Sequence, residues 1–360
     1  MVVLPEDVED VQRLIAFASQ EGLPITPRGG GSGTAGSALG QGIVLALPEN
    51  EYWGAISDYS ATRNSAQVSV SAGVYHNALQ KFLKERGFFL PADVTSAAIS
   101  RIGGNIATRA SGPHALKYGS IDRFVESVEF ITSKGELVDT ANEETIPERF
   151  KTKLAALEQR IRQDDASRRL LESRKELKTS SGYNLFAFLD DLSVGQRIAQ
   201  LLCGSVGTLG IITRARLRAE VYTADRAAVI LYFDSLAEAG RAVSLLRKTD
   251  AAAIELISRE TIRVIRAQTV LPGQLAVDAQ ELGDPPGRRG VEHHGVVLAG
   301  GLAAPALLGG LEDLAGKLAA NGGQSIGKFP TSALAVFACE IDRWHDFTPR
   351  TGKLKKLFMP

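Results

Sequence analysis

Residues 28–36 read Arg-Gly-Gly-Gly-Ser-Gly-Thr-Ala-Gly, which places five glycines within nine residues. Short apolar segments, 23–27 and 43–47, stand on either side and are expected to be strands. Glycine permits backbone conformations that other residues avoid, so several N–H groups of such a loop can converge on one anion. The pattern is neither a P-loop nor a Rossmann turn, because no Gly-Lys-Ser/Thr follows and a strand comes next. We expect a phosphate-binding loop; a flexible linker is the alternative.

A second glycine-bearing segment lies about seventy residues further along the chain. Residues 102–112 read Ile-Gly-Gly-Asn-Ile-Ala-Thr-Arg-Ala-Ser-Gly, with glycines beside small hydroxyl-bearing side chains. Two such loops can bind two phosphates, so together they indicate a dinucleotide. Two unrelated turns are the alternative that the spacing leaves open.

The composition is that of a folded protein with two or three domains. The chain has 360 residues, of which 44% are hydrophobic and 23% are charged. Its 41 basic and 41 acidic residues give a net charge of zero, which offers no support for a nucleic-acid partner. The two cysteines lack CxxC spacing, so neither a disulfide framework nor a structural zinc site is expected.

The first residues, Met-Val-Val-Leu-Pro-Glu-Asp, leave no room for a secretion signal, and we therefore expect a cytoplasmic location. The uncharged run 295–311 is short for a membrane span and contains five glycines and a proline. We interpret it as a buried strand, a turn and the start of a helix.

Apolar periodicity alternates helices with strands along the chain. The first helix has its stripe from Val8 to Ala18 and is expected to end at Gly22. The densely charged stretch 143–178 is typical of a surface helix pair. A new α/β layer is expected to begin near residue 222. The other expected strands are 68–72, 124–132, 211–219, 227–233, 253–257 and 296–298, and the other expected helices are about 75–86, 198–203, 236–247, 259–267 and 307–320.

Four strings, in order across residues 1 to about 220, resemble the signatures of the FAD-linked oxidases, the family of vanillyl-alcohol oxidase and p-cresol methylhydroxylase. They are Pro-Arg-Gly-Gly-Gly-Ser-Gly-Thr at 27–34, Leu-Pro-Ala-Asp at 90–93 leading to Ile-Gly-Gly-Asn-Ile-Ala at 102–107, Ala-Ser-Gly-Pro at 110–113 with Leu-Lys-Tyr-Gly at 116–119, and Gly-Ser-Val-Gly-Thr-Leu-Gly-Ile-Ile-Thr at 204–213. The branch resembled is that of the D-lactate and glycolate dehydrogenases, and the string at 178–185 is similar to its larger bacterial members.

This resemblance implies an α+β fold. Residues 1–221 would form a two-subdomain FAD-binding domain that carries the charged helical insert. Residues 222–360 would form a partial ferredoxin-like α/β cap domain, and the chain would be truncated at both ends relative to its family.

The resemblance also implies a set of FAD-binding residues. The FAD would be non-covalent, because no histidine stands in the first glycine loop, where some members attach the flavin. A side chain in place of Gly30 is expected to occupy the space of a phosphate. The implied residues are Arg28, Gly29, Gly30, Gly31, Ser32, Gly33 and Thr34 around the pyrophosphate; Gly103, Gly104, Ala107, Ser111 and Gly112 near the diphosphate and flavin ring; Ile211 beside the cofactor; and Pro91 and Asp93 in the adjoining wall.

Two residues of the chain depart from the family pattern. Arg109 and Val206 stand where the family usually has Asn and Glu. A buried Arg109 can help to hold a diphosphate, whereas Val206 loses a polar contact.

The histidines also depart from the family pattern. In relatives the cap supplies a divalent-metal site and a catalytic histidine through strings such as His-x-x-Gly-Asp-Gly-Asn-x-His, and none of the five histidines here has that spacing. We expect His76 at the surface, His114 as a neutral hydrogen-bonded side chain, and His293-His294 in an exposed loop. Cys203 is expected to be buried. No catalytic residue and no metal ligand is assigned.

The resemblance implies an FAD-dependent oxidoreductase. Its substrate would be a D-2-hydroxy acid of the lactate, glycolate or 2-hydroxyglutarate class, oxidised to the 2-oxo acid by hydride transfer to flavin N5. The alternatives are a non-catalytic or split-subunit FAD-binding fragment without the cap's metal and histidine site, and another FAD-linked chemistry such as alcohol or sugar oxidation. The expected partner is a small 2-hydroxy acid, with no nucleic acid and no membrane span. The electron acceptor, and the choice between a homodimer and a missing partner segment, stay open.

Overall fold

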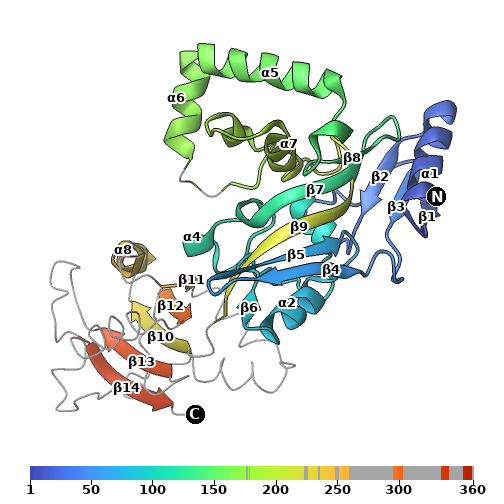
Figure 1. Cartoon of the computed structure of the whole chain (residues 1–360). Helices are drawn as coiled ribbons and strands as arrows, with labels where there is room; N and C mark the ends of the chain where they lie inside the picture. The colour runs from blue at the N-terminus through green and yellow to red at the C-terminus, as the bar shows by residue number, and fades with distance from the viewer. Residues whose placement is uncertain are drawn as a thin grey trace. The chain divides into compact units, whose positions relative to one another are not determined.

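The computed structural model describes residues 1–175, 177, 179–222, 226–233, 236–247, 251–258, 295–302, 334–339 and 352–358. The chain divides into two compact units, Met1–Tyr222 and Thr223–Pro360 (Figure 1). The helices expected at 259–267 and 307–320, and the histidines at 293, 294 and 345, lie outside the described residues.

A small parallel sheet opens the N-terminal unit. Its strand order is β1-β3-β2, with β1 at Val2–Val3, β2 at Ile25–Arg28 and β3 at Ile43–Ala46. Helix α1, Val8–Glu21, begins at Asp7, whose side chain accepts a hydrogen bond from the N–H of Asp10, and ends at Gly22 with φ 63. Its buried face supplies Val11 and Ile15 to the core. The predicted helix, its glycine end and the strands on both sides of the glycine loop are confirmed.

A larger antiparallel sheet forms the second layer. Its order is β4-β5-β9-β7-β8, with β6 paired to β9. The central strand β9 buries alternate residues, Ala215, Leu217 and Ala219, while three arginines point to the other face. The short strands β4, β6 and β8 carry no clear signal in the sequence. The bounds are Ile56–Ala61 for β4, Ser65–Ser71 for β5, Phe88–Phe89 for β6, Val125–Ile131 for β7, Leu137–Asp139 for β8 and Ile211–Val221 for β9.

Helices cover this sheet and extend from it. Helix α7 packs on β7, and the charged pair α5 and α6, confirmed as two helices, forms an arm that contacts η3 (Figure 1). Glu158 of α5 is paired with Arg197 of α7, whose side chain is buried, at 2.8 Å. The bounds are His76–Lys84 for α2, Ile102–Ala107 for α3, Ala115–Tyr118 for α4, Ile121–Phe124 for η1, Glu143–Thr145 for η2, Glu148–Gln163 for α5, Asp165–Arg174 for α6, Leu185–Phe188 for η3 and Val194–Leu202 for α7.

One continuous apolar core joins the two layers. It runs from Val11 of α1 and Leu45 of β3 through Val68 of β5 to Ile106 of α3 and Leu202 of α7. The small sheet and the large sheet therefore fold as parts of a single domain.

The burial of His76 differs from the prediction. It begins helix α2, as expected, but it is completely buried rather than at the surface. Its main-chain N–H donates to the carbonyl of Ser100, its Nδ1 lies 3.1 Å from Nδ2 of Asn105, and its Nε2 lies 3.4 Å from Nε2 of Gln80. The segment before α3 thus covers the first turn of α2, a tertiary contact that helical periodicity does not report. Burial lowers the pKa of His76 to about 4.

The C-terminal unit contains a five-stranded sheet of order β11-β12-β10-β13-β14. The order β11-β12-β10-β13 and the helix between β10 and β11 are those of a ferredoxin-like unit, although β10 and β13 run parallel. The expected α+β class is confirmed. The bounds are Arg226–Phe233 for β10, Leu236–Leu246 for α8, Ala253–Ser258 for β11, Gly295–Leu302 for β12, Leu334–Cys339 for β13 and Gly352–Phe358 for β14.

None of the helices in the described part of the chain has the length and apolar character that crossing a bilayer requires. The run that begins at residue 295 opens with strand β12.

We predict that His76 makes the N-terminal unit acid-sensitive. Its pKa is about 4 in the folded state and about 6.5 when unfolded, so protons bind preferentially to the unfolded chain. The free energy of unfolding should be undiminished above pH 6.5 and should fall by roughly 3 kcal/mol as the pH drops from 6.5 to 4. Urea unfolding of wild type and His76→Gln at several pH values measures this. The free energy of unfolding of the variant should lack the pH dependence that His76 contributes. Equal slopes would contradict the prediction.

Candidate functional site

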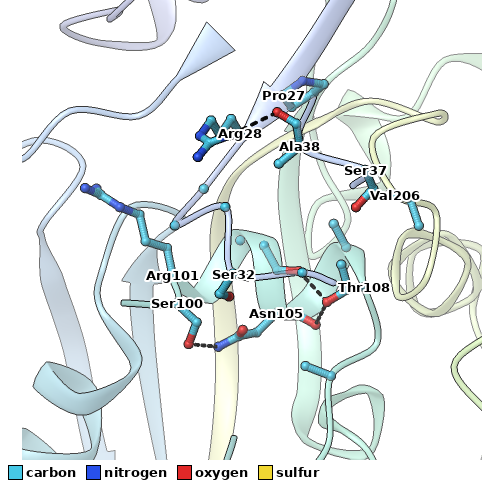
Figure 2. A pocket seen from close by; sticks show the side chains of 18 of the residues that line it. Pro27, Arg28, Ser32, Ser37, Ala38, Ser100, Arg101, Asn105, Thr108 and Val206 are labelled. Atoms are coloured by element: carbon cyan, nitrogen blue, oxygen red, sulfur yellow. Dashed lines mark hydrogen bonds between the residues drawn. The ribbon is translucent and has the colours of Figure 1, made fainter. Parts of the chain in front are cut away.

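A cavity of about 380 Å³ in the N-terminal unit brings the two glycine segments together (Figure 2). Its walls are the loop after β2, helix α3 with the segments on each side of it, and the start of β9 with the loop before it. Arg28, Arg101 and Arg109 line it, and none of its lining residues is an aspartate or glutamate. The cavity is therefore suited to an anion.

The first glycine loop contributes free main-chain donors. The backbone N–H groups of residues 30–34 donate no hydrogen bond to any residue that the structure describes. Arg28 at the start of the loop donates to the carbonyl of Ala38 at 3.3 Å (Figure 2), and its guanidinium lies across Gly31. Gly31 has φ 65, and a Cβ there would collide with that guanidinium. The loop thus combines five unpaired N–H groups with a nearby cation, as an anion nest requires.

Gly30 has a different role from the one expected. A Cβ on Gly30 would collide with the main-chain carbonyl of Ile99, so the missing side chain lets the loop approach the segment before α3. The expectation that a side chain there would fill the space of a phosphate was wrong in its reason. Gly30 is required by a contact within the protein.

The second glycine segment is partly a helix rather than a loop. Helix α3 covers Ile102–Ala107, and the N–H groups of Ile102 and Gly103 donate to the carbonyls of Val74 and Ala72, each at 2.9 Å. These two amides are therefore not available to a ligand. Gly104 contributes open space instead, because a Cβ there would meet only the Cα of Gly29, at 4.0 Å. A cavity wall without side chains leaves space into which a bulky cofactor can fit.

Twelve of the fifteen predicted cofactor-binding residues line this cavity. They are Arg28, Gly29, Gly30, Gly31, Ser32, Gly33, Thr34, Gly103, Gly104, Ala107, Ser111 and Ile211.

The other three, Pro91, Asp93 and Gly112, do not line the cavity. A Cβ on Gly112 would collide with the carbonyl of Asp93, so these two segments abut directly behind the lining. His114 lies beside them, with Nδ1 at 3.6 Å from Oδ2 of Asp93, and its ring meets those of Phe89 and Tyr118 edge-on.

Helix α3 also contributes residues that the sequence did not suggest. Arg101, Asn105 and Thr108 line the cavity, at positions i, i+4 and i+7 along the helix and its caps (Figure 2). Arg101 donates to the carbonyls of Pro48 and Gly73 at 3.2 and 3.1 Å. A helical interpretation of residues 101–108 would have placed these three side chains on one face.

The loop before β9 closes the cavity at the C-terminal end of α3. The N–H groups of Gly204 and Val206 donate to the carbonyls of Ile106 and Ala107, at 3.1 and 2.9 Å. Val206 has φ 53, an unusual conformation for a β-branched residue, and its side chain lines the cavity.

Among the described residues, no group of three or more His, Cys, Asp or Glu side chains could hold a metal ion. Cys203 is completely buried, as predicted, and burial raises the pKa of its thiol far above the ordinary value, which makes the thiol unreactive.

A two-sheet α+β domain with a glycine-walled, carboxylate-free cavity defines a binding domain for a phosphate-bearing cofactor. Residues 1–141 match the family described as FAD binding domain. An alkyldihydroxyacetonephosphate synthase structure superposes with a TM-score of 0.58 at 19% identity, covering 86% of this chain and 49% of that one, and this likeness shows the fold.

Two relatives, each named as a dehydrogenase, are similar to a large part of this chain. The D-2-hydroxyglutarate dehydrogenase of Pantoea ananatis is 30% identical over 272 residues, which are 73% of this chain and 26% of that protein. The D-lactate dehydrogenase of Archaeoglobus fulgidus is 26% identical over 267 residues, or 73% of this chain and 48% of that protein. The chain thus spans about a quarter of the first relative and about half of the second. The chain is similar to the FAD-linked oxidases, and its cofactor is FAD.

We predict that substitutions of Gly104 move stability and FAD binding in opposite directions. Gly104→Ala should raise the free energy of unfolding of the FAD-free protein by about 0.5–1 kcal/mol, because alanine favours a helix and meets no protein atom closely. Gly104→Leu should weaken FAD binding at least tenfold, because its side chain enters the cavity. Urea unfolding and fluorescence titration with FAD measure the two effects.

The matched control is Gly240→Ala. Gly240 lies in helix α8 with open space around its missing Cβ, so this variant should change stability alone. Wild-type affinity in Gly104→Leu would show that FAD does not pass this helix.

Proposed function

We propose that the chain is the FAD-binding part of an oxidoreductase that converts a D-2-hydroxy acid into the 2-oxo acid. The observation that carries the proposal is the cavity itself, in which five unpaired main-chain N–H groups and the Arg28 cation line a space without carboxylates. The related D-2-hydroxyglutarate and D-lactate dehydrogenases support the substrate class.

The first glycine loop is proposed to bind the pyrophosphate. The N–H groups of residues 30–34 would donate to phosphate oxygens, and Arg28 would offset part of the charge. Hydrogen bonds to a charged group contribute about 1.5–3 kcal/mol each, so several amides are sufficient for a non-covalent cofactor.

Helix α3 and strand β9 are proposed to hold the remainder of the cofactor. Gly104 and Ala107 would let it approach the helix closely, and Gly103 would hold the helix against Ala72. Ser111 would donate or accept through its hydroxyl, and Ile211 would give an apolar contact. Pro91, Asp93 and Gly112 would act from behind this lining by fixing the position of the 110–112 segment.

When bound, FAD supplies the two-electron redox chemistry, while the protein binds and orients the reactants. Residues 222–360 are proposed to be a partial cap (substrate) domain.

A second candidate is an FAD-binding fragment without catalytic activity. It rests on the sequence, in which none of the five histidines has the spacing of the metal-binding and catalytic strings that the resemblance implies.

Anaerobic reduction distinguishes the two candidates. We predict that the purified protein retains FAD and that D-2-hydroxyglutarate, D-lactate or glycolate bleaches the flavin absorbance, with the L-enantiomers of the chiral acids as matched controls. Zinc or manganese is added in parallel. Bleaching by a D-acid supports the dehydrogenase. FAD retention without bleaching by any acid would leave the fragment, and a protein that cannot be loaded with FAD would contradict both.

A further inference from the structure

Arg109 combines two features that are costly in a folded protein. Its backbone is left-handed, with φ 49, and its side chain is about nine-tenths buried. A long side chain in the left-handed region is unusual, and a buried cation is stable only with a close counter-charge. Both features occur in a residue that lines the FAD cavity.

The position of Arg109 in the chain explains the strained backbone. Helix α3 ends in two bonds, from the N–H of Ala110 to the carbonyl of Asn105 at 2.8 Å and from the N–H of Arg109 to the carbonyl of Ile106 at 2.9 Å. This is the Schellman pattern, in which the left-handed position after the cap normally carries Gly or Asn. An arginine is present at this position despite its backbone preference, which indicates that its charge is used.

The counter-charge of Arg109 lies outside the cavity. Its Nη2 is 3.0 Å from Oδ2 of Asp122, which is also buried and which accepts a hydrogen bond from Asn184 at 3.3 Å. Asp122 does not line the FAD cavity but a second pocket, and Arg109 lines both. The cation therefore stands between the FAD cavity and its own carboxylate.

This ion pair is incompletely satisfied. Nε of Arg109 and Oδ1 of Asp122 are buried without a hydrogen-bond partner among the described residues, so the two groups meet through one contact rather than as a two-bond fork. A singly bonded pair leaves more of the positive potential of the guanidinium uncompensated. In a buried setting that potential extends into the adjoining cavity with little screening by salt.

We propose that Arg109 is an electrostatic anchor for the diphosphate of FAD and that Asp122 limits its strength. Arg109 acts as a positioning charge, without needing direct contact with the phosphates. The proposal rests on the FAD site and is independent of which acid is oxidised.

The test compares two variants for which the proposal requires opposite changes in FAD affinity. Arg109→Asn removes the cation and suits the left-handed backbone; FAD should bind at least tenfold more weakly. Asp122→Asn keeps the shape and removes the opposing charge; FAD should bind two- to fivefold more tightly, a smaller change because the second pocket admits solvent to that side. Dissociation constants are measured by fluorescence titration at low and high salt, and both effects should largely persist at high salt because the two buried charges are little screened. A purely structural ion pair predicts weaker binding in both variants, which would overturn the proposal.

Titrations with two further ligands complete the experiment. ADP carries the diphosphate without the flavin and should show both shifts, whereas riboflavin carries no phosphate and should show neither. Shifts confined to riboflavin would overturn the assignment to the diphosphate. If Arg109→Asn fails to fold because Asp122 is left unpaired, Asp122→Asn alone decides by the sign of its effect. Wild-type protein that binds no FAD would instead overturn the cofactor site, and with it the proposed function.

Discussion

The close approach of two backbones is the constraint on which the cavity depends. The glycine loop after β2 reaches helix α3 because side chains are missing where they meet: a Cβ on Gly29 would stand 3.6 Å from Gly104, and one on Gly30 would strike Ile99. Helix α3 in turn lies close to the turn after β5, since a Cβ on Gly103 would meet Ala72. At Gly30 and Gly103 the contact is short because glycine removes an atom, and any larger residue at these two positions would move one wall of the cavity.

Helix α3 is the element that unites the domain. Its first N–H groups bond to the carbonyls of Ala72 and Val74, after the strand β5 of the large sheet, and its last carbonyls accept from the loop before β9. These groups at both helix ends are therefore satisfied by protein, while the side of the helix at Gly104 stays open to the cavity. Six residues with two glycines would not form a stable helix in isolation, so the surrounding structure imposes it.

The dependence of helix α3 on its surroundings explains which features could be predicted from the sequence and which could not. Helix α1 and strand β9 were predicted because each buries one face against a large core, which produces a visible period. The first glycine loop was predicted because glycines between two strands are informative by themselves. Helix α3 was missed because its stability comes from its neighbours, and the burial of His76 was missed because the covering segment is distant in sequence. The three arginines of the cavity were not seen as a set, since only the fold brings Arg28, Arg101 and Arg109 together.

The strain at the cavity follows from the same arrangement. Arg109 and Val206 both adopt left-handed backbones, and they are joined through the end of α3, where Val206 donates to Ala107 and Arg109 to Ile106. A left-handed non-glycine residue costs about 1 kcal/mol or more, and glycine at either position would remove that cost. Glycine would also remove the cation from one wall and the apolar side chain from the other. The chain therefore accepts a less stable backbone at the two residues that set the charge and the shape of the cavity, while the glycines on the facing wall set its width.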